Sequence, residues 1–250
     1  MFGTHRILVT MTVTFLCAPS ALAAVPMGGY ARFVKTKRVE PAEFRAGPTR
    51  GLDGDRRIMG RSLALFTRGG DGAVGVELTN GSVTALRTIF EVRSVAVPEC
   101  TTGASATFTQ RGRYFNAGVA APGDATGDVQ GFVRVRQTSE TGPLSVEAGV
   151  EQCDDASCSA RTVLGAPVPL GTLGRDAMTS VALTWDPAND RFVFQLAWGA
   201  EVTVPYAVSD ANAAGRPSTA MEVETTSTCA GDAPRIDARV QQVWVDASAL

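Results

Sequence analysis

Few side chains in this sequence could carry acid–base chemistry. The single histidine, His5, lies within the first two dozen residues, so the rest of the chain cannot form a Ser-His-Asp triad. Lys35 and Lys37 are the only lysines, and a Ser-Lys arrangement would have to use one of them from a charged N-terminal stretch. The sequence therefore predicts no catalytic residue of the nucleophile–base type.

Carboxylates are the remaining candidates for catalysis. Glu222 and Glu224 share one face of an expected strand, and Glu147 and Glu151 share one face of another. Glycoside hydrolysis needs only two carboxylates, about 5–5.5 Å apart for retention and farther apart for inversion. Since surface carboxylates are common, a carbohydrate-active enzyme, a glycoside hydrolase or lyase, is an alternative and not the leading prediction.

Aromatic and basic side chains are candidates for ligand binding. Trp198 and Tyr206 lie near expected strand ends, where an aromatic ring can stack on a sugar. Arg134 and Arg136 alternate with valines, so we expect them on the outer face of a strand, where they could hold an acidic or hydroxyl-rich ligand. The simpler interpretation of these arginines is a solvated outer face.

Calcium is the metal that the loops could hold, because oxygen ligands are plentiful in them. The candidate ligands are Asp124 with Asp128 and Asp154 with Asp155. Each pair is also typical of an ordinary turn, in which an aspartate bonds to the nearby backbone. We expect no cofactor other than this candidate calcium.

The cysteines predict two disulfides. Cys153 and Cys158 bracket the tight loop CDDASC and are partners by proximity, which leaves Cys100 to pair with Cys229. The rival is a zinc site, but the chain lacks paired C-x-x-C spacing and has no histidine near these cysteines. Disulfides indicate an oxidising compartment.

Residues 1–23 have the parts of a secretory signal peptide. A short basic start precedes an apolar run over residues 7–18, and residues 21–23 (Ala-Leu-Ala) place small side chains where a signal peptidase cleaves. The run is shorter than the about 20 residues of a membrane span. Cys17 follows a leucine, which is a poor match to a lipoprotein signal. We expect a secreted or periplasmic protein without a membrane span.

The rest of the sequence predicts an all-β fold. Period-2 runs flanked by Gly, Pro, Asn and Asp recur, whereas long stretches with helical periodicity are missing. We predict a two-sheet antiparallel β-sandwich, a jelly roll of about 12 strands, over residues 58–250. Residues 24–57 are expected to form an N-terminal arm or an irregular first strand. The dipeptide Asn80-Gly81 predicts a hairpin between strands at 73–78 and 82–97.

Two neighbouring strand motifs carry a family resemblance. The sequence Leu183-Thr184-Trp185-Asp186 is followed by a turn and by Arg191-Phe192-Val193-Phe194. This succession, within the segment 146–196, resembles the concanavalin A-like lectin/glucanase (LamG-like) jelly rolls, including those of exported bacterial proteins. The resemblance implies a sandwich with a glycan as the expected ligand. The E-x-D-x-E strand of the glucanase branch has no match, because the sequence around residues 222–224 is Glu-Val-Glu.

The formal net charge of −2 disfavours nucleic acid as a partner. The leading prediction is an exported, non-catalytic β-sandwich that acts as a glycan-binding or envelope-associated interaction module, with a glycan or an envelope protein as its partner. The alternatives are the carbohydrate-active enzyme and a purely structural or protein-interaction domain.

Overall fold

The computed structural model of the chain describes residues 36–50, 53–79, 83–98, 103–119, 121–139, 141–228 and 233–246. The predicted signal peptide and the predicted pair Cys100–Cys229 lie outside these residues. In the described residues no helix has the length and apolar character needed to cross a membrane.

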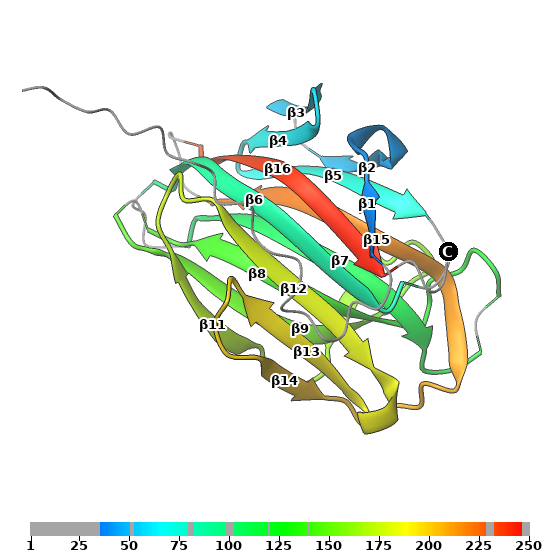
Figure 1. Cartoon of the computed structure of the whole chain (residues 1–250). Helices are drawn as coiled ribbons and strands as arrows, with labels where there is room; N and C mark the ends of the chain where they lie inside the picture. The colour runs from blue at the N-terminus through cyan, green and yellow to red at the C-terminus, as the bar shows by residue number, and fades with distance from the viewer. Residues whose placement is uncertain are drawn as a thin grey trace, which may run out of the picture. The chain divides into compact units, whose positions relative to one another are not determined.

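The described residues form sixteen strands and two short 3-10 turns (Figure 1). They are β1 (Thr36–Val39), η2 (Pro41–Glu43), β2 (Arg45–Arg50), β3 (Asp53–Met59), β4 (Ser62–Arg68), β5 (Asp71–Thr79), β6 (Ala85–Ala96), β7 (Ser105–Asn116), β8 (Asp128–Gln137), β9 (Leu144–Cys153), β10 (Arg161–Val163), β11 (Val168–Leu173), β12 (Thr179–Asp186), η3 (Pro187–Asn189), β13 (Arg191–Leu196), β14 (Val202–Pro205), β15 (Asn212–Thr226) and β16 (Arg235–Asp246).

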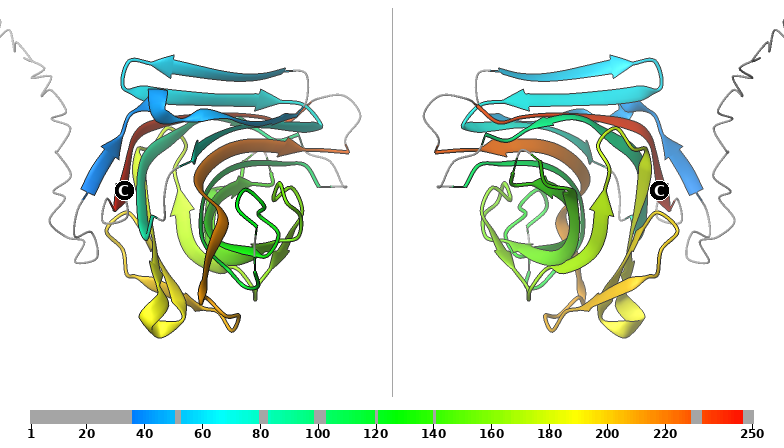
Figure 2. Two further views of the ribbon diagram at one scale, coloured as in Figure 1. Left: turned by 90° about the vertical axis from the view of Figure 1, so that its right-hand side faces the viewer. Right: turned by 90° about the vertical axis from the view of Figure 1, so that its left-hand side faces the viewer.

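The strands form two antiparallel sheets. Sheet A has the order β14-β13-β12-β6-β16-β4-β3, with β1 paired to β16, and sheet B has the order β10-β9-β8-β7-β15-β5-β2, with β11 paired to β9. Figure 2 shows the two sheets as stacked layers, with sheet B strongly curved. The predicted two-sheet antiparallel sandwich is therefore confirmed.

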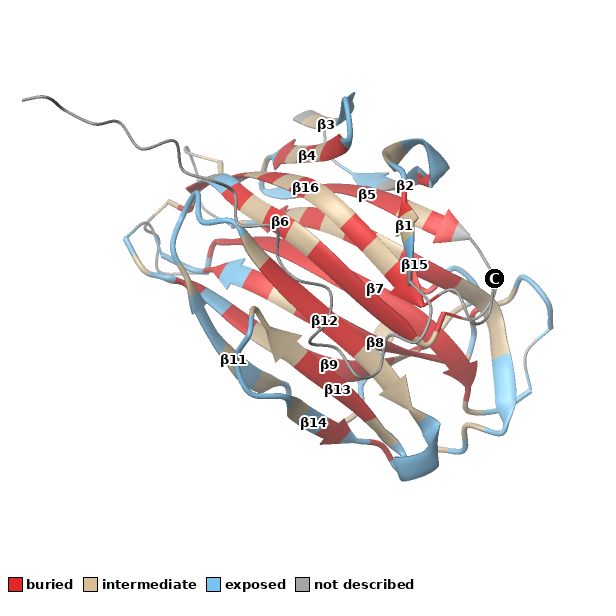
Figure 3. Cartoon of the chain, viewed as in Figure 1, coloured by how far each residue is buried: buried red, intermediate tan, exposed pale blue. Residues whose placement is uncertain are grey.

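The core lies between the sheets and follows the alternation of each strand. Phe192 and Phe194 on β13 are fully buried, as are Met221 and Val223 on β15. Figure 3 shows buried residues along strands of both sheets, such as β6 and β7. Because successive side chains point to opposite faces, the residues between these core positions must face outward. In sheet B this outward set is rich in charge.

The predicted Asn80-Gly81 hairpin is wrong. Residues 80–82 lie outside the described part, but β5 pairs with β15 and β2 whereas β6 pairs with β12 and β16. The chain thus crosses from one sheet to the other at this point. A local turn signal cannot distinguish such a crossing from a hairpin, because both require a tight reversal of the chain.

Several strands differ in extent from the prediction. The segment expected to be an arm or an irregular first strand contains β1 and β2 and most of β3, which add to the free edges of β16, β5 and β4. Strand β7 is a single strand that continues through Gly112. Its full length matters because both arginines that flank Gly112 contribute to the site.

Candidate functional site

The outer face of sheet B carries a pocket of about 530 Å³. Arg111 and Arg113 on β7 line it, and so do Glu222 and Glu224 on β15. Residues two apart on a strand share one face, so each of these pairs points to the same side of the sheet. Ser157 and Ser159, in the loop after β9, form one wall. We call this cavity the sheet B pocket. Its polar lining also includes Arg50, Glu77, Gln130, Arg161 and Arg216.

Arg111 lies at the centre of a buried ion-pair network. Its Nε donates to Glu151 Oε1 at 3.1 Å and its Nη1 donates to Glu222 Oε2 at 2.6 Å. Gln130 Nε2 donates to the same Glu151 oxygen at 2.6 Å. Burial alone would lower the pKa of Arg111, but the charges of Glu222 and Glu151 more than offset it and raise that pKa above its usual value. Arg111 is thus fully compensated by its neighbours.

A second network at the β5 side of the pocket contains two arginines and one carboxylate. Arg113 Nη2 donates to Glu77 Oε1 at 2.5 Å, and Arg216 Nη2 donates to Glu77 Oε2 at 2.8 Å. Burial, with the charge of Arg216 adding to it, lowers the pKa of Arg113 in spite of Glu77 and Asp128. The positive charge of Arg113 is therefore only partly compensated.

Asp128 holds the backbone that carries Arg216. This aspartate is fully buried, and its carboxylate accepts from the backbone N–H of Gly215 at 2.7 Å, from that of Arg216 at 2.9 Å and from Asn116 Nδ2 at 2.8 Å. The contact falls where the pairing of β15 with β7 shifts register between Ala213 and Ser218. Asp128 is thus a positioning residue for a pocket arginine.

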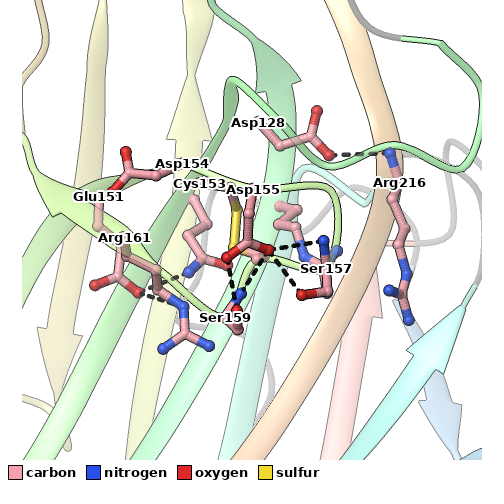
Figure 4. Close-up of a disulfide and its surroundings, with 12 residues drawn as sticks. Asp128, Glu151, Cys153, Asp154, Asp155, Ser157, Ser159, Arg161 and Arg216 are labelled. Carbon is pink, nitrogen blue, oxygen red and sulfur yellow. Dashed lines mark hydrogen bonds and ion pairs between the residues drawn. A yellow bond between two sulfur atoms is a disulfide. The ribbon is translucent and has the colours of Figure 1, made fainter.

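A disulfide and one aspartate hold the wall of the pocket. Cys153 and Cys158 are bonded, which confirms this predicted pair. Asp155 lies between the two cysteines in sequence and accepts five hydrogen bonds. The donors are the backbone N–H groups and hydroxyls of Ser157 and Ser159 and the backbone N–H of Ala160. These bonds, those from the side chains of Ser159 and Ser157 first, lower the pKa of Asp155 far below its usual range. Figure 4 shows this loop with Arg161 on one side and Arg216 on the other.

The four aspartates predicted as calcium ligands accept hydrogen bonds from groups of the chain itself. Asp124 Oδ1 accepts from the backbone of Thr126 at 2.8 Å, and Asp154 Oδ2 accepts from Thr162 Oγ1 at 3.1 Å. Asp128 and Asp155 have the partners given above. In the described ranges no three His, Cys, Asp or Glu side chains are grouped as metal ligands. Each of the four carboxylates thus already accepts at least one hydrogen bond from the chain itself.

Of the predicted aromatic platforms, only one is exposed. Trp198 is 51% exposed, with the Arg87 guanidinium carbon 4.9 Å from its ring centroid. Tyr206 is buried: its ring packs against Phe115, its hydroxyl accepts from Trp185 Nε1 at 2.9 Å, and burial raises its pKa. Its ring therefore offers no open face to a sugar.

The two predicted arginines of β8 lie on the outer face, as expected. Arg134 donates to Glu147 Oε1 at 3.0 Å, and its guanidinium carbon lies 4.7 Å from the Phe132 ring centroid. Arg136 is exposed. Neither lines the sheet B pocket.

Of the two predicted carboxylate pairs, Glu222 and Glu224 both line the sheet B pocket, whereas Glu147 and Glu151 do not. Glu222 and Glu151 converge on Arg111 from different strands, while Glu224 accepts from Arg50 Nη2 at 2.7 Å and Glu147 from Arg134. Each of the four carboxylates thus has an arginine partner.

Most residues of the pocket were not predicted from the sequence. Among them are Glu77, Arg111, Arg113, Gln130, Arg161 and Arg216. One signal was present: Arg111 and Arg113 stand two residues apart in a segment rich in Phe and Thr, which is typical of a strand with one charged face. Which other strands face those arginines is decided by long-range pairing.

Comparison with known proteins gives similarity of fold only. No protein-family model and no curated protein sequence matches the chain. Among solved structures, the potassium-bound carbohydrate recognition domain of Emp46p is 10% identical with a TM-score of 0.49, covering 84% of this chain and 90% of that one. The Bacillus licheniformis β-glucanase is 10% identical with a TM-score of 0.47, covering 88% of this chain and 95% of that one. Peanut lectin is 9% identical with a TM-score of 0.44, covering 84% of this chain and 96% of that one.

These neighbours are lectin and glucanase domains, the two groups named by the sequence resemblance. At such identities and TM-scores we transfer none of their properties to this chain.

Proposed function

We propose that this protein is an exported, non-catalytic β-sandwich that binds a glycan in the sheet B pocket. One observation carries the proposal: hydrogen-bonding groups of both kinds are held on rigid strands around a cavity of about 530 Å³. That volume is within the about 300–1,000 Å³ of typical ligand pockets. Sugar hydroxyls both donate and accept, so a wall of guanidinium donors and carboxylate acceptors matches them.

The arrangement of the carboxylates supports a binding role over hydrolysis. A glycosidase needs one carboxyl group that is protonated and another that is free to attack or to activate water. Glu222 and Glu151 are both bound to the same buried arginine, at 2.6 and 3.1 Å. Both carboxylates are occupied by that arginine, so neither is free to act on a substrate.

Export is part of the proposal and rests on two observations. The first 23 residues have the composition of a signal peptide, and the Cys153–Cys158 disulfide belongs to an oxidising environment such as the periplasm or the medium. Calcium is not included, because the candidate aspartates already bind donors of the chain. An envelope protein remains the alternative partner, favoured if no glycan binds.

A glycan array probed with the oxidised mature protein tests the proposal, with EDTA in a parallel arm. The test variant is Ala220→Trp, because Ala220 lines the pocket without taking part in its ion pairs and a large side chain there fills the cavity. The control is Arg235→Gln, an exposed position on β16 of the other sheet.

We expect glycan binding that persists in EDTA, is lost in Ala220→Trp and is unchanged in Arg235→Gln. A blank array would overturn the proposal. Turnover of a bound glycan, abolished by Glu222→Gln or Glu147→Gln, would replace it with the carbohydrate-active enzyme.

A further inference from the structure

The sheet B pocket has more unsatisfied donors than acceptors at its β5 side. Glu77 uses both of its oxygens, one for Arg113 and one for Arg216. Each guanidinium has five N–H groups, so the two oxygens of one carboxylate cannot accept a hydrogen bond from every N–H group of two arginines. Arg113 is 92% buried, with a side-chain exposure of 8%, and its Nη1 is fully enclosed with no hydrogen-bond partner in the described part of the chain.

Arg161 shows the same deficit on the other side of the disulfide loop. Its nearest carboxylate, Glu151, is 3.8 Å from Nε, which is beyond hydrogen-bond range, and that Nε is buried with no hydrogen-bond partner among the described residues. Burial first, and then the charge of Arg111, lowers the pKa of Arg161. A buried cation without enough acceptors is costly, and an anion brought by a ligand would supply them.

The rest of the lining points in the same direction. None of the described residues that line the pocket is aromatic, so a neutral sugar ring finds no surface on which to stack. Affinity must then come from hydrogen bonds, and those between guanidinium and an anionic oxygen are about twice as strong as neutral ones.

We propose that the ligand of the sheet B pocket is an anionic glycan, whose carboxylate or sulfate group is bound by Arg113 and Arg216, with Arg161 able to bind a second acidic group. The inference rests on the proposed function, because it takes the same pocket and specifies the class of sugar. Glu222 and Glu224, each with one oxygen in an ion pair, remain at the pocket wall to accept from the ligand's hydroxyls.

Isothermal titration of the oxidised mature protein tests this inference with three matched probes: trigalacturonate, a sulfated galactotriose and unmodified galactotriose. We expect one or both anionic probes to bind at least about tenfold more tightly than galactotriose, because hydrogen bonds from a guanidinium to an anionic oxygen are stronger than those to a neutral hydroxyl. Comparison of the two anionic probes distinguishes a carboxylate from a sulfate preference.

Variants locate the anion in the pocket. Arg216 is the first to change, because its side chain is 35% exposed and its replacement by glutamine leaves the buried Arg113–Glu77 pair in place. Arg216→Gln should weaken binding of the anionic probe about tenfold and binding of galactotriose, which has no acidic group, much less. Arg216→Lys, which retains the charge, should lose less affinity for the anionic probe. Arg235→Gln should change neither.

The outcomes separate the inference from the function on which it rests. Equal affinity for all three probes would overturn the anionic preference and leave glycan binding in place. An anionic probe whose affinity is the same in Arg216→Gln and in the unaltered protein would also overturn it. No binding to any probe, together with a blank array, would overturn both proposals.

Discussion

Replacement of Arg111 by methionine tests whether the buried network on sheet B is as strongly coupled as its geometry indicates. The substitution keeps an unbranched apolar side chain and removes the guanidinium that binds Glu151 at 3.1 Å and Glu222 at 2.6 Å. Removal of one partner from a buried ion pair costs about 3–5 kcal/mol, because a charge is left without compensation. Glu151 retains its bond from Gln130 at 2.6 Å, so we expect the lower end, about 3 kcal/mol.

The free energy of unfolding in urea at pH 7 measures this loss. The carboxylates raise the pKa of Arg111, so its guanidinium is fully charged at pH 7 and the stability that this charge provides is present there. An experiment at neutral pH therefore records the whole contribution of the guanidinium.

The matched control is Arg134→Met on the neighbouring strand. The Arg134–Glu147 pair has side-chain exposures of 25% and 31%, and an exposed pair of this kind contributes about 0–1 kcal/mol. Combining Arg111→Met with Glu151→Gln and Glu222→Gln should recover part of the loss, because the unpaired charges are then gone. Equal losses for Arg111→Met and Arg134→Met would refute the reasoning.

Three further changes test other parts of the structure. Replacing Cys153 and Cys158 together by alanine should lower the free energy of unfolding by about 2 kcal/mol in urea, the value for so short a loop. Because its hydrogen bonds lower the pKa of Asp155, the stability they give is present above about pH 3.9 and is lost as the pH falls below it. The melting temperature should therefore fall more steeply between pH 4 and pH 2 in the unaltered protein than in Asp155→Asn. Gly149→Ala would place a Cβ 2.7 Å from Cζ of Phe132 and should cost about 1–3 kcal/mol in thermal unfolding.

Each of these three changes has its own control. Chemical reduction should reproduce the loss seen in the double cysteine variant, and a stable reduced protein would contradict the estimate. Asp154→Asn, in the same loop with a single hydroxyl partner, should retain the steep acid dependence. Gly174→Ala meets no heavy atom closer than 3.7 Å and should change the free energy of unfolding by less than about 0.5 kcal/mol; a cost equal to that of Gly149→Ala would remove the steric explanation.

The parts of the fold that depend on local pattern could be predicted from the sequence. Alternation placed Arg134 and Arg136 on the outer face and the valines beside them inside, because a strand has only two faces. The spacing of Cys153 and Cys158 identified their disulfide, because a sequence separation of five positions keeps the two side chains near each other. The assignment of strands to the two sheets was not predictable in this way, as the Asn80-Gly81 error shows.

The site could not be predicted because its residues meet only through long-range pairing. Arg111 belongs to β7 and its two carboxylates belong to β9 and β15, so no local spacing relates them. Asp128 and Asp155 were identified as loop oxygens available to a metal, but the number of backbone N–H groups around each is set by the folded loops. Tyr206 was placed correctly near a strand end, and its burial follows from the packing of Phe115 across the core.

The walls of the sheet B pocket come from β2, β5, β7, β8, β10 and β15 and from the disulfide loop. Such a cavity exists only when the whole sheet has formed, so occupancy and folding must be thermodynamically linked. A ligand present at a hundred times its dissociation constant would add about 2.7 kcal/mol to the free energy of unfolding. Melting temperature is therefore a detector of occupancy that needs no labelled sugar and no immobilised surface. Fractions of polysaccharide digests can be screened by heating the protein in their presence, and the fraction that delays unfolding contains the ligand.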